Sequence, residues 1–234
     1  MRDIFVICGI DSHIDRIKRT VKNIQTVLSD PEKPVDIGIA TFGSPKLRPS
    51  ERLREYARGK RFLFYDAPRQ KWVTLGREFH CCEVIGMLTL SKWYYEKGFD
   101  RVFLLHNDIY IDRDFRELIA EWPIRKCWSF IAPVIKTERR DHISLDLPEA
   151  DALRLHSHQL SMTTTRISQE CVIFSRKFVD AMYATYGSEE KMWTDLFVYS
   201  SMYGDLCLTD IKNHLGFEPK LVRPFLEHGG KWQH

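Results

Sequence analysis

The sequence predicts a single α/β domain built around a mostly parallel sheet. In its first half, short apolar runs typical of buried strands alternate with longer segments of helical periodicity. The chain has 234 residues, of which 44% are hydrophobic, and this suits one domain with a sizeable core. Because strands separated by helices join through right-handed crossovers, we expect parallel strands with helices flanking the sheet.

The predicted elements of the first half follow one another regularly. Strands are expected at 4–8, 35–42, 61–65 and 101–105, and helices at 14–28, 49–58 and 77–97. The first helix carries apolar residues at three- and four-residue spacing, and Gly98 is a common stop for the last. After Arg101 the fourth strand has no polar residue, which favours a central strand covered on both faces.

The second half is less regular. Strands are expected at 128–135, 170–174 and 220–223, and helices at about 177–186, 189–203 and 205–215. Residues 136–168 are polar and rich in His, Arg and Thr, so we expect mainly loop with at most one helical turn. A loop of this length in a compact domain is usually functional, for example as a lid or an acceptor-binding region.

Composition limits the partners and the compartment. Lys and Arg outnumber Asp and Glu by only 35 to 32, which argues against nucleic acid or an anionic membrane surface as the main partner. The six cysteines form no CxxC pair, so free thiols in a reducing compartment are expected. No apolar run approaches the ~20 residues that cross a bilayer. We therefore expect no transmembrane segment and a cytoplasmic protein.

The most informative segment is 104–112, where a buried strand ends at side chains that can bind metal. Leu104 and Leu105 precede His106, Asn107 and Asp108, and an apolar run then returns. In open α/β sheets, ligands bind beyond the carboxyl ends of the strands. An acid placed there can hold Mg²⁺ or Mn²⁺, and the cation can bridge the oxygens of a diphosphate. An ordinary strand-to-helix turn capped by polar residues is the plain alternative.

This segment resembles the Asp-x-Asp turn of glycosyltransferases with the GT-A fold, in which four apolar residues precede the motif. His106 takes the place of the first Asp, Asn107 is the middle residue and Asp108 is the second Asp. The resemblance implies a GT-A-like (Rossmann-like) fold, a nucleoside-diphosphate sugar as donor, and Asp108 as direct ligand of a divalent metal. His106 departs from the pattern, so it either binds metal, contacts the ribose of the donor or marks a weakened or lost metal site. Asp112 is either an outer neighbour of the metal or a helix cap.

A second resemblance lies at Gly204-Asp205, with Gly216-Phe217 downstream. Many inverting GT-A enzymes open a helix with a Glu-Asp pair that a Gly-aromatic step follows eleven residues after the Asp. The implied role of Asp205 is the general base that removes the proton of the acceptor hydroxyl. An Asp at a helix N-terminus is also favoured by the helix dipole alone. Asp195 is the second candidate base.

A third resemblance lies at the end of the sequence, at His228-Gly229-Gly230-Lys231-Trp232. Several GT-A families have a His-x-x-Gly-x-Lys-x-Trp-type tail, and the spacing here is compressed. The resemblance implies that His228 completes the metal shell and that Lys231 meets the diphosphate. Glycines let backbone approach a phosphate closely, although a frayed terminus is the plain alternative.

The turns after the first three strands supply the expected nucleotide pocket. Gly9 and Asp11 follow the first strand, Thr41 and Gly43 lie at the end of the second, and Asp66 follows the third. GT-A enzymes hold the base and ribose with loops at these positions. Arg77, before the metal-bearing strand, is a candidate diphosphate contact. Residues of these types also occur in ordinary turns.

The resemblance therefore implies a metal-assisted glycosyltransferase that acts on a glycan or glycoconjugate acceptor. An Asp base predicts inversion of the anomeric carbon, but a tail of this kind also occurs in retaining families, so retention stays open. Residues 1–112 are expected to bind the nucleotide sugar and residues 113–234 the acceptor. Two alternatives remain open: a catalytically weak or inactive relative that keeps the sugar-nucleotide pocket, and a sugar nucleotidyltransferase.

Overall fold

The computed structural model describes the chain in separate ranges. These are residues 2–9, 13–28, 30, 34–41, 51–65, 79–107, 109–112, 115–117, 130–136, 165–167, 171–192, 220–222 and 226–228.

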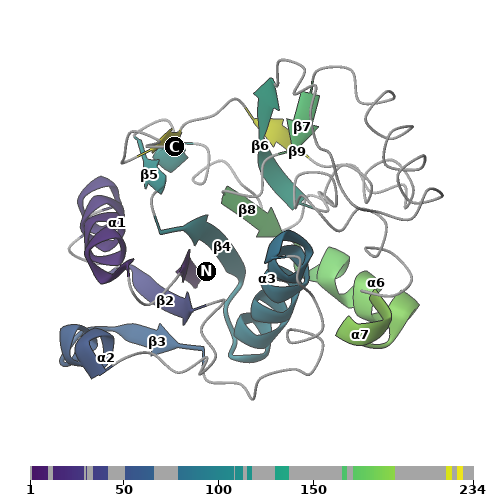
Figure 1. Cartoon of the computed structure of the whole chain (residues 1–234), viewed down its shortest axis with the longest axis horizontal. Helices are drawn as coiled ribbons and strands as arrows, with labels where there is room; N and C mark the ends of the chain where they lie inside the picture. The colour runs from purple at the N-terminus through teal and green to yellow at the C-terminus, as the bar shows by residue number, and fades with distance from the viewer. Residues whose placement is uncertain are drawn as a thin grey trace.

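The first half alternates strands and helices, as predicted (Figure 1). Its elements are β1 (Asp3–Gly9), α1 (Ile14–Val27), β2 (Asp36–Thr41), α2 (Glu51–Ala57), β3 (Phe62–Phe64), α3 (Phe79–Glu96) and β4 (Arg101–His106). After α3, Gly98 has a φ of 85°, a left-handed conformation that glycine adopts without strain. The helix therefore ends where the sequence predicts.

The second half contains shorter elements. They are β5 (Ile109–Ile111), β6 (Phe130–Lys136), β7 (Thr165–Ile167), β8 (Cys171–Phe174), α6 (Arg176–Tyr186), α7 (Glu189–Met192), β9 (Lys220–Val222) and β10 (Leu226–His228). The expected strands near 128–135, 170–174 and 220–223 and the helix near 177–186 are confirmed. Of the helix expected at 189–203 only α7 is described, and 205–215 lies outside the described residues. β7 corrects the expectation of a loop at its position, and β5 and β10 were not predicted.

One large sheet contains strands from both halves of the chain. Its order is β3-β2-β1-β4-β8-β6-β7, and β9 pairs with β6. β3, β2, β1 and β4 run parallel, while β8 is antiparallel to both β4 and β6. The mostly parallel sheet and the central position of β4 are thus confirmed. β5 and β10 form a separate antiparallel pair.

Helices cover both faces of this sheet. Alternate residues of β1 enter different apolar clusters: Phe5 and Ile7 pack on the side of α1 and α2, whereas Ile4 and Val6 pack on the side of α3, α6 and α7. Figure 1 shows α1 and α2 on the left and α3, α6 and α7 on the right. Because both faces are covered, the side chains of Val102–Leu105 are fully buried.

Gly38 allows a tyrosine to lie directly against β2. Tyr94 of α3 is fully buried, and its hydroxyl donates a hydrogen bond to the carbonyl oxygen of Leu63 at 2.9 Å. A Cβ atom at position 38 would lie 2.7 Å from the Tyr94 hydroxyl oxygen and 2.9 Å from Cγ2 of Val6. A side chain at position 38 would therefore displace Tyr94 or spread the strands.

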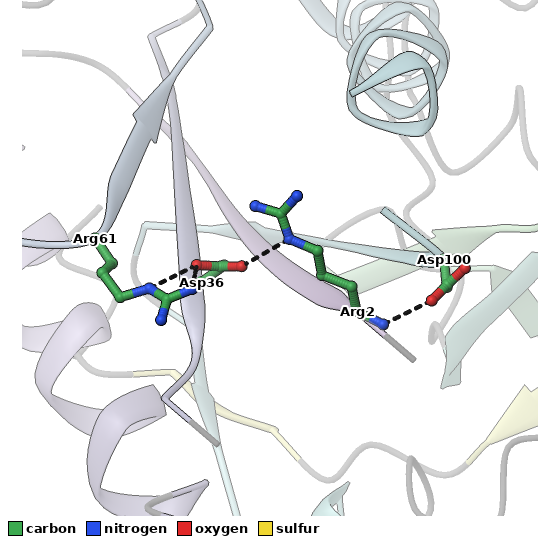
Figure 2. Close-up of polar contacts among 4 residues, drawn as sticks. All are labelled: Arg2, Asp36, Arg61 and Asp100. Carbon is green, nitrogen blue, oxygen red and sulfur yellow. Dashed lines mark hydrogen bonds and ion pairs between the residues drawn. The ribbon is translucent and has the colours of Figure 1, made fainter. Parts of the chain in front are cut away.

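Charged side chains join the strands at their amino ends. Asp36 accepts hydrogen bonds from Nε of Arg2 and from Nε of Arg61, each at 3.2 Å, as Figure 2 shows. The backbone N–H of Arg2 donates to the Asp100 carboxylate at 2.6 Å. These contacts tie the starts of β1, β2, β3 and β4 at the edge opposite the carboxyl ends.

Two other expectations concern cysteines and membranes. Cys8 and Cys171 are buried free thiols, as their apolar surroundings in the sequence predict. Within the described ranges, no helix is both long and apolar enough to cross a membrane.

Candidate functional site

The carboxyl ends of the three central parallel strands lie side by side. β1 pairs with both neighbours, so that Cys8 lies opposite His106 and Gly9 lies opposite Thr41. Neighbouring strands are about 4.8 Å apart. The structure thus brings the backbones of Gly9, Thr41 and His106, three of the predicted donor-binding positions, to one edge of the sheet.

The turn after β4 contains a buried amide. Asn107 is only 7% exposed, and its side-chain Nδ2 has no hydrogen-bond partner among the described residues. A buried donor left unsatisfied costs about 1–3 kcal/mol, so native structures seldom keep one without a reason. An amide donor held at a ligand-binding edge is able to donate to an oxygen of a bound molecule.

A two-stranded ribbon places the end of the described chain beside this turn. β10 runs antiparallel to β5, with Leu226 opposite Ile111 and His228 opposite Ile109. Directly opposite residues of such a pair have Cα atoms about 4.5–5.5 Å apart. The backbone of His228 therefore lies opposite Ile109, the residue that directly follows Asp108 in the sequence. Sequence resemblance had predicted Asp108 and His228 as the metal ligands.

Two polar residues of α1 also reach this region. The Thr20 hydroxyl donates to the carbonyl oxygen of Asn107, and the Asn23 carboxamide bonds the backbone of Ile111. Sequence reasoning did not single out either residue. The sequence does indicate that Thr20 is buried, because it falls among Ile17, Val21 and Ile24 on the apolar face of the helix.

Asp112 has a structural role in the described chain. Its Oδ1 accepts a hydrogen bond from the backbone N–H of Phe115 at 2.9 Å, and residues 115–117 are helical. This is the geometry of a helix N-cap. Of the two sequence interpretations of Asp112, the structure shows the cap.

The other predicted site residues lie outside the described residues. They are Asp11, Gly43, Asp66, Arg77, Asp108, Asp195, Asp205 and Lys231. Their roles, and those of the side chains of Thr41 and His228, therefore stay predictions. In the described part of the chain, no three His, Cys, Asp or Glu side chains gather as a metal site.

A divalent metal fits the chemistry of the predicted ligands. Asp108 sits between the described residues 107 and 109, and the pairing of β5 with β10 brings the His228 backbone alongside. A carboxylate oxygen and an imidazole nitrogen are ligands that Mn²⁺ accepts, and Mg²⁺ prefers oxygen ligands. The backbone arrangement is compatible with the predicted pair.

Comparisons with known proteins show the fold class. No protein-family model matches the sequence, and no curated protein matches it. Solved structures do match, and they define a GT-A-type fold, as the sequence resemblance predicted.

Three of these structures illustrate the likeness. Mouse xyloside xylosyltransferase 1 has a TM-score of 0.51 at 10% identity, over 94% of this chain and 84% of that protein. The bifunctional glycosyltransferase WbbM has a TM-score of 0.52 at 14% identity, over 95% of this chain and 38% of that one. The glycosyltransferase GlyE of Streptococcus pneumoniae TIGR4 has a TM-score of 0.50 at 12% identity, over 95% of this chain and 45% of that one. At such identities the likeness establishes the fold, and this chain spans less than half of the length of WbbM and of GlyE.

Proposed function

We propose that the protein is a metal-assisted glycosyltransferase that moves a sugar from a nucleoside-diphosphate sugar to a hydroxyl of a glycan or glycoconjugate. The observation that carries this proposal is the pairing of β5 with β10. It brings the backbone of His228 opposite Ile109, immediately after Asp108, at the carboxyl end of a fully buried central strand. Ligands of open α/β sheets bind at that edge, and the GT-A fold supports the same site.

Asp108 and His228 are the proposed ligands of Mn²⁺ or Mg²⁺. A bound divalent cation there would neutralise the negative charge that develops on the departing diphosphate. His106, at the end of β4, contacts the metal or the donor. The buried side-chain amide of Asn107 donates a hydrogen bond to an oxygen of the sugar nucleotide, which would give its Nδ2 the hydrogen-bond partner that it lacks. Lys231 adds a positive charge beside the phosphates.

The nucleotide lies along the carboxyl ends of β1, β2 and β3. Gly9 and Thr41 end two adjacent strands of that edge. We assign them, with Asp11 and Asp66, to the base and ribose, and Arg77 to the diphosphate. Glycine at position 9 leaves room for the donor to approach the backbone.

The acceptor reacts through a base on the second half of the chain. Asp205, with Asp195 as the second candidate, takes the proton of the acceptor hydroxyl. The acceptor oxygen then forms a bond to the anomeric carbon as the bond from that carbon to the diphosphate oxygen breaks. The nucleoside diphosphate leaves, and attack from the face opposite the leaving group inverts the carbon. Residues 1–112 would bind the donor and residues 113–234 the acceptor, in a cytoplasmic enzyme.

Calorimetry and donor hydrolysis together test the proposal. UDP and GDP are titrated with and without Mn²⁺, and UDP- and GDP-sugars are then followed for slow hydrolysis. The expected result is metal-dependent binding of one of the two nucleotides, which Asp108→Ala abolishes. Asp112→Ala is the matched control, because Asp112 is a nearby acid that caps the next helical turn. Retained metal-dependent binding in Asp108→Ala contradicts the site.

A second candidate function is a module that binds the sugar nucleotide without catalysing its turnover, and His106 is the residue that favours it. A His stands where the family resemblance has an Asp, and metal-independent binding without donor hydrolysis would support the module. The variant His106→Asp restores the acid. We expect it to tighten Mn²⁺ binding if residue 106 faces the cation. Release of pyrophosphate from a nucleoside triphosphate and a sugar phosphate would instead identify a nucleotidyltransferase.

A further inference from the structure

We propose that Thr20 and Asn23 of α1 are positioning residues that hold segment 107–111, and thereby the backbone of Asp108, in a single orientation at the sheet edge. The inference rests on the proposed function in one respect, because it assigns the two residues to the geometry of the proposed metal turn. The contacts themselves are independent of that function.

Asn23 takes the place of a neighbouring strand along β5. Its Nδ2 donates to the carbonyl oxygen of Ile111 at 3.0 Å, and its Oδ1 accepts from the N–H of Ile111 at 2.8 Å. One carboxamide thus satisfies both backbone groups of one residue, as a paired strand residue does. β10 pairs with β5 as well, so the ribbon is bound to α1 through Asn23 and to β10 through its ladder.

Thr20 holds the other end of the segment. Its hydroxyl donates to the carbonyl oxygen of Asn107 at 2.8 Å, and the residue is 0% exposed. A buried hydroxyl is costly unless it forms a hydrogen bond, so this contact is strongly favoured. Asn107 directly precedes Asp108, and therefore the plane of the peptide that joins them is held by the helix.

The two anchors lie on either side of Asp108. Thr20 and Asn23 are three residues apart, which places them on one face of α1, and they bind the backbone one residue before and three residues after position 108. Apolar packing supports the same contact, because Ile109 and Ile111 share a core cluster with Ile24 and its helix neighbours.

The polar anchors add what apolar packing cannot supply. Apolar burial is non-directional, so it holds the segment near α1 without setting its rotation. A hydrogen bond requires an aligned donor and acceptor, and it therefore sets the orientation of the peptide groups. A metal ligand has to be held within about 0.5 Å of its productive position. We therefore expect the anchors to act on metal affinity more than on global stability.

Substitutions on α1 separate positioning from stability. Thr20→Val removes the hydroxyl at nearly constant shape, and Thr20→Ser retains it. Asn23→Leu removes both hydrogen-bonding groups. Ile85→Val of α3 is the matched control, because Ile85 belongs to the apolar cluster on the other face of the sheet, apart from the cluster that holds Ile109 and Ile111. Thr26→Val is the surface control, because the Thr26 hydroxyl bonds only the carbonyl oxygen of Lys22 within α1 among the described contacts.

Three measurements are made on each variant. Mn²⁺ affinity in the presence of UDP or GDP is read from the electron paramagnetic resonance signal of free Mn²⁺. Urea unfolding gives stability. Hydrogen–deuterium exchange reports how well peptides covering 107–111 are held, whether or not a metal binds.

The expected result is a loss of Mn²⁺ affinity of about 10- to 100-fold in Thr20→Val and Asn23→Leu, the size seen when an outer-shell partner of a ligand is removed. Thr20→Ser should recover most of it. Ile85→Val should lower stability and leave affinity unchanged, and exchange in 107–111 should quicken only in the two anchor variants.

Two failures can be told apart. If the wild type binds Mn²⁺ with nucleotide and the anchor variants bind it as well as Ile85→Val does, the positioning inference is overturned. If the wild type binds no Mn²⁺ with either nucleotide, the proposed function fails, and hydrogen exchange then decides the anchors. Selectively faster exchange in 107–111 supports them, and exchange equal to that of Ile85→Val overturns them.

Discussion

Replacing Arg101 with methionine should destabilise the protein far more than replacing Arg61 with alanine. Both arginines pair with an aspartate at the amino ends of the sheet strands, at the edge opposite the candidate site. They differ in burial: the side chain of Arg101 is 6% exposed and that of Arg61 is 61% exposed. The comparison therefore tests whether burial decides the strength of these ion pairs.

The size of each stability loss depends on how deeply buried the ion pair is that the substitution breaks. Arg101 of β4 lies directly opposite Asp3 of β1 and binds both of its carboxylate oxygens, with Nε at 2.7 Å from Oδ1. Breaking a buried pair costs about 3–5 kcal/mol, because a buried charge loses its partner. The Asp3 side chain is 25% exposed, so we expect Arg101→Met to lose stability near the lower of these two values. An exposed pair such as Arg61 with Asp36 contributes about 0–1 kcal/mol.

Urea unfolding followed by tryptophan fluorescence measures both losses, and the chain has six tryptophans. A third variant combines Asp3→Leu with Arg101→Met. Because apolar side chains replace both charges, it should recover most of the stability that Arg101→Met loses. Nucleotide binding should change in none of the three, since the pairs lie at the amino edge of the sheet.

Two results would refute this reasoning. Equal losses in Arg101→Met and Arg61→Ala would show that burial does not decide the strength of the pairs. A double variant no more stable than Arg101→Met would show that lost packing of the arginine, rather than the unpaired carboxylate, causes the destabilisation.

Three further predictions follow from single contacts. Gly38→Ala should cost about 1–3 kcal/mol of unfolding free energy through overpacking; Tyr94→Phe in the same chain should relieve part of this loss, because the tightest contact is with the hydroxyl. Asp112→Ala should cost about 0.5–2 kcal/mol and Asp112→Asn much less, since asparagine also caps helices, and thermal unfolding measures the difference. Burial, with the charge of Glu189 nearby, raises the pKa of Tyr65 from 10.0 to about 12, so the unfolded state ionises first and stability should fall as the pH rises through that window. Tyr65→Phe should show a smaller alkaline loss in urea titrations, and an unchanged loss would contradict the assignment.

The first half of the fold could be predicted because its pattern is repeated and strong. Residues Val102–Leu105 of β4 are apolar in the sequence and are buried on both faces of the sheet in the structure. The apolar spacing of α1 matches its buried residues, and Gly98 ends α3 with a positive φ. Each of these signals is local, so it can be read without knowing which distant segments meet.

The arrangement of the site could be predicted only in part. Resemblance paired Asp108 with His228, but the strands that bring His228 opposite Ile109 have three residues each. A three-residue strand presents at most two side chains on one face, which is too few for a period of two to be recognised. The bonds from Thr20 and Asn23 join positions more than eighty residues apart, and nothing in a single sequence indicates that separation.

The pairing of β5 with β10 has a consequence for how the protein folds during its synthesis on the ribosome. Synthesis runs from the amino end at about 5–20 residues per second, so the parallel strands and α1 emerge well before Leu226. Until then the backbone groups of β5 that pair with β10 have no strand to pair with, and an exposed strand edge can pair with other chains. A message cut short before the codon for Leu226 would yield a product that retains much of the buried framework but lacks His228. Metal binding by the proposed pair of Asp108 and His228 would then come only after the parallel strands have folded.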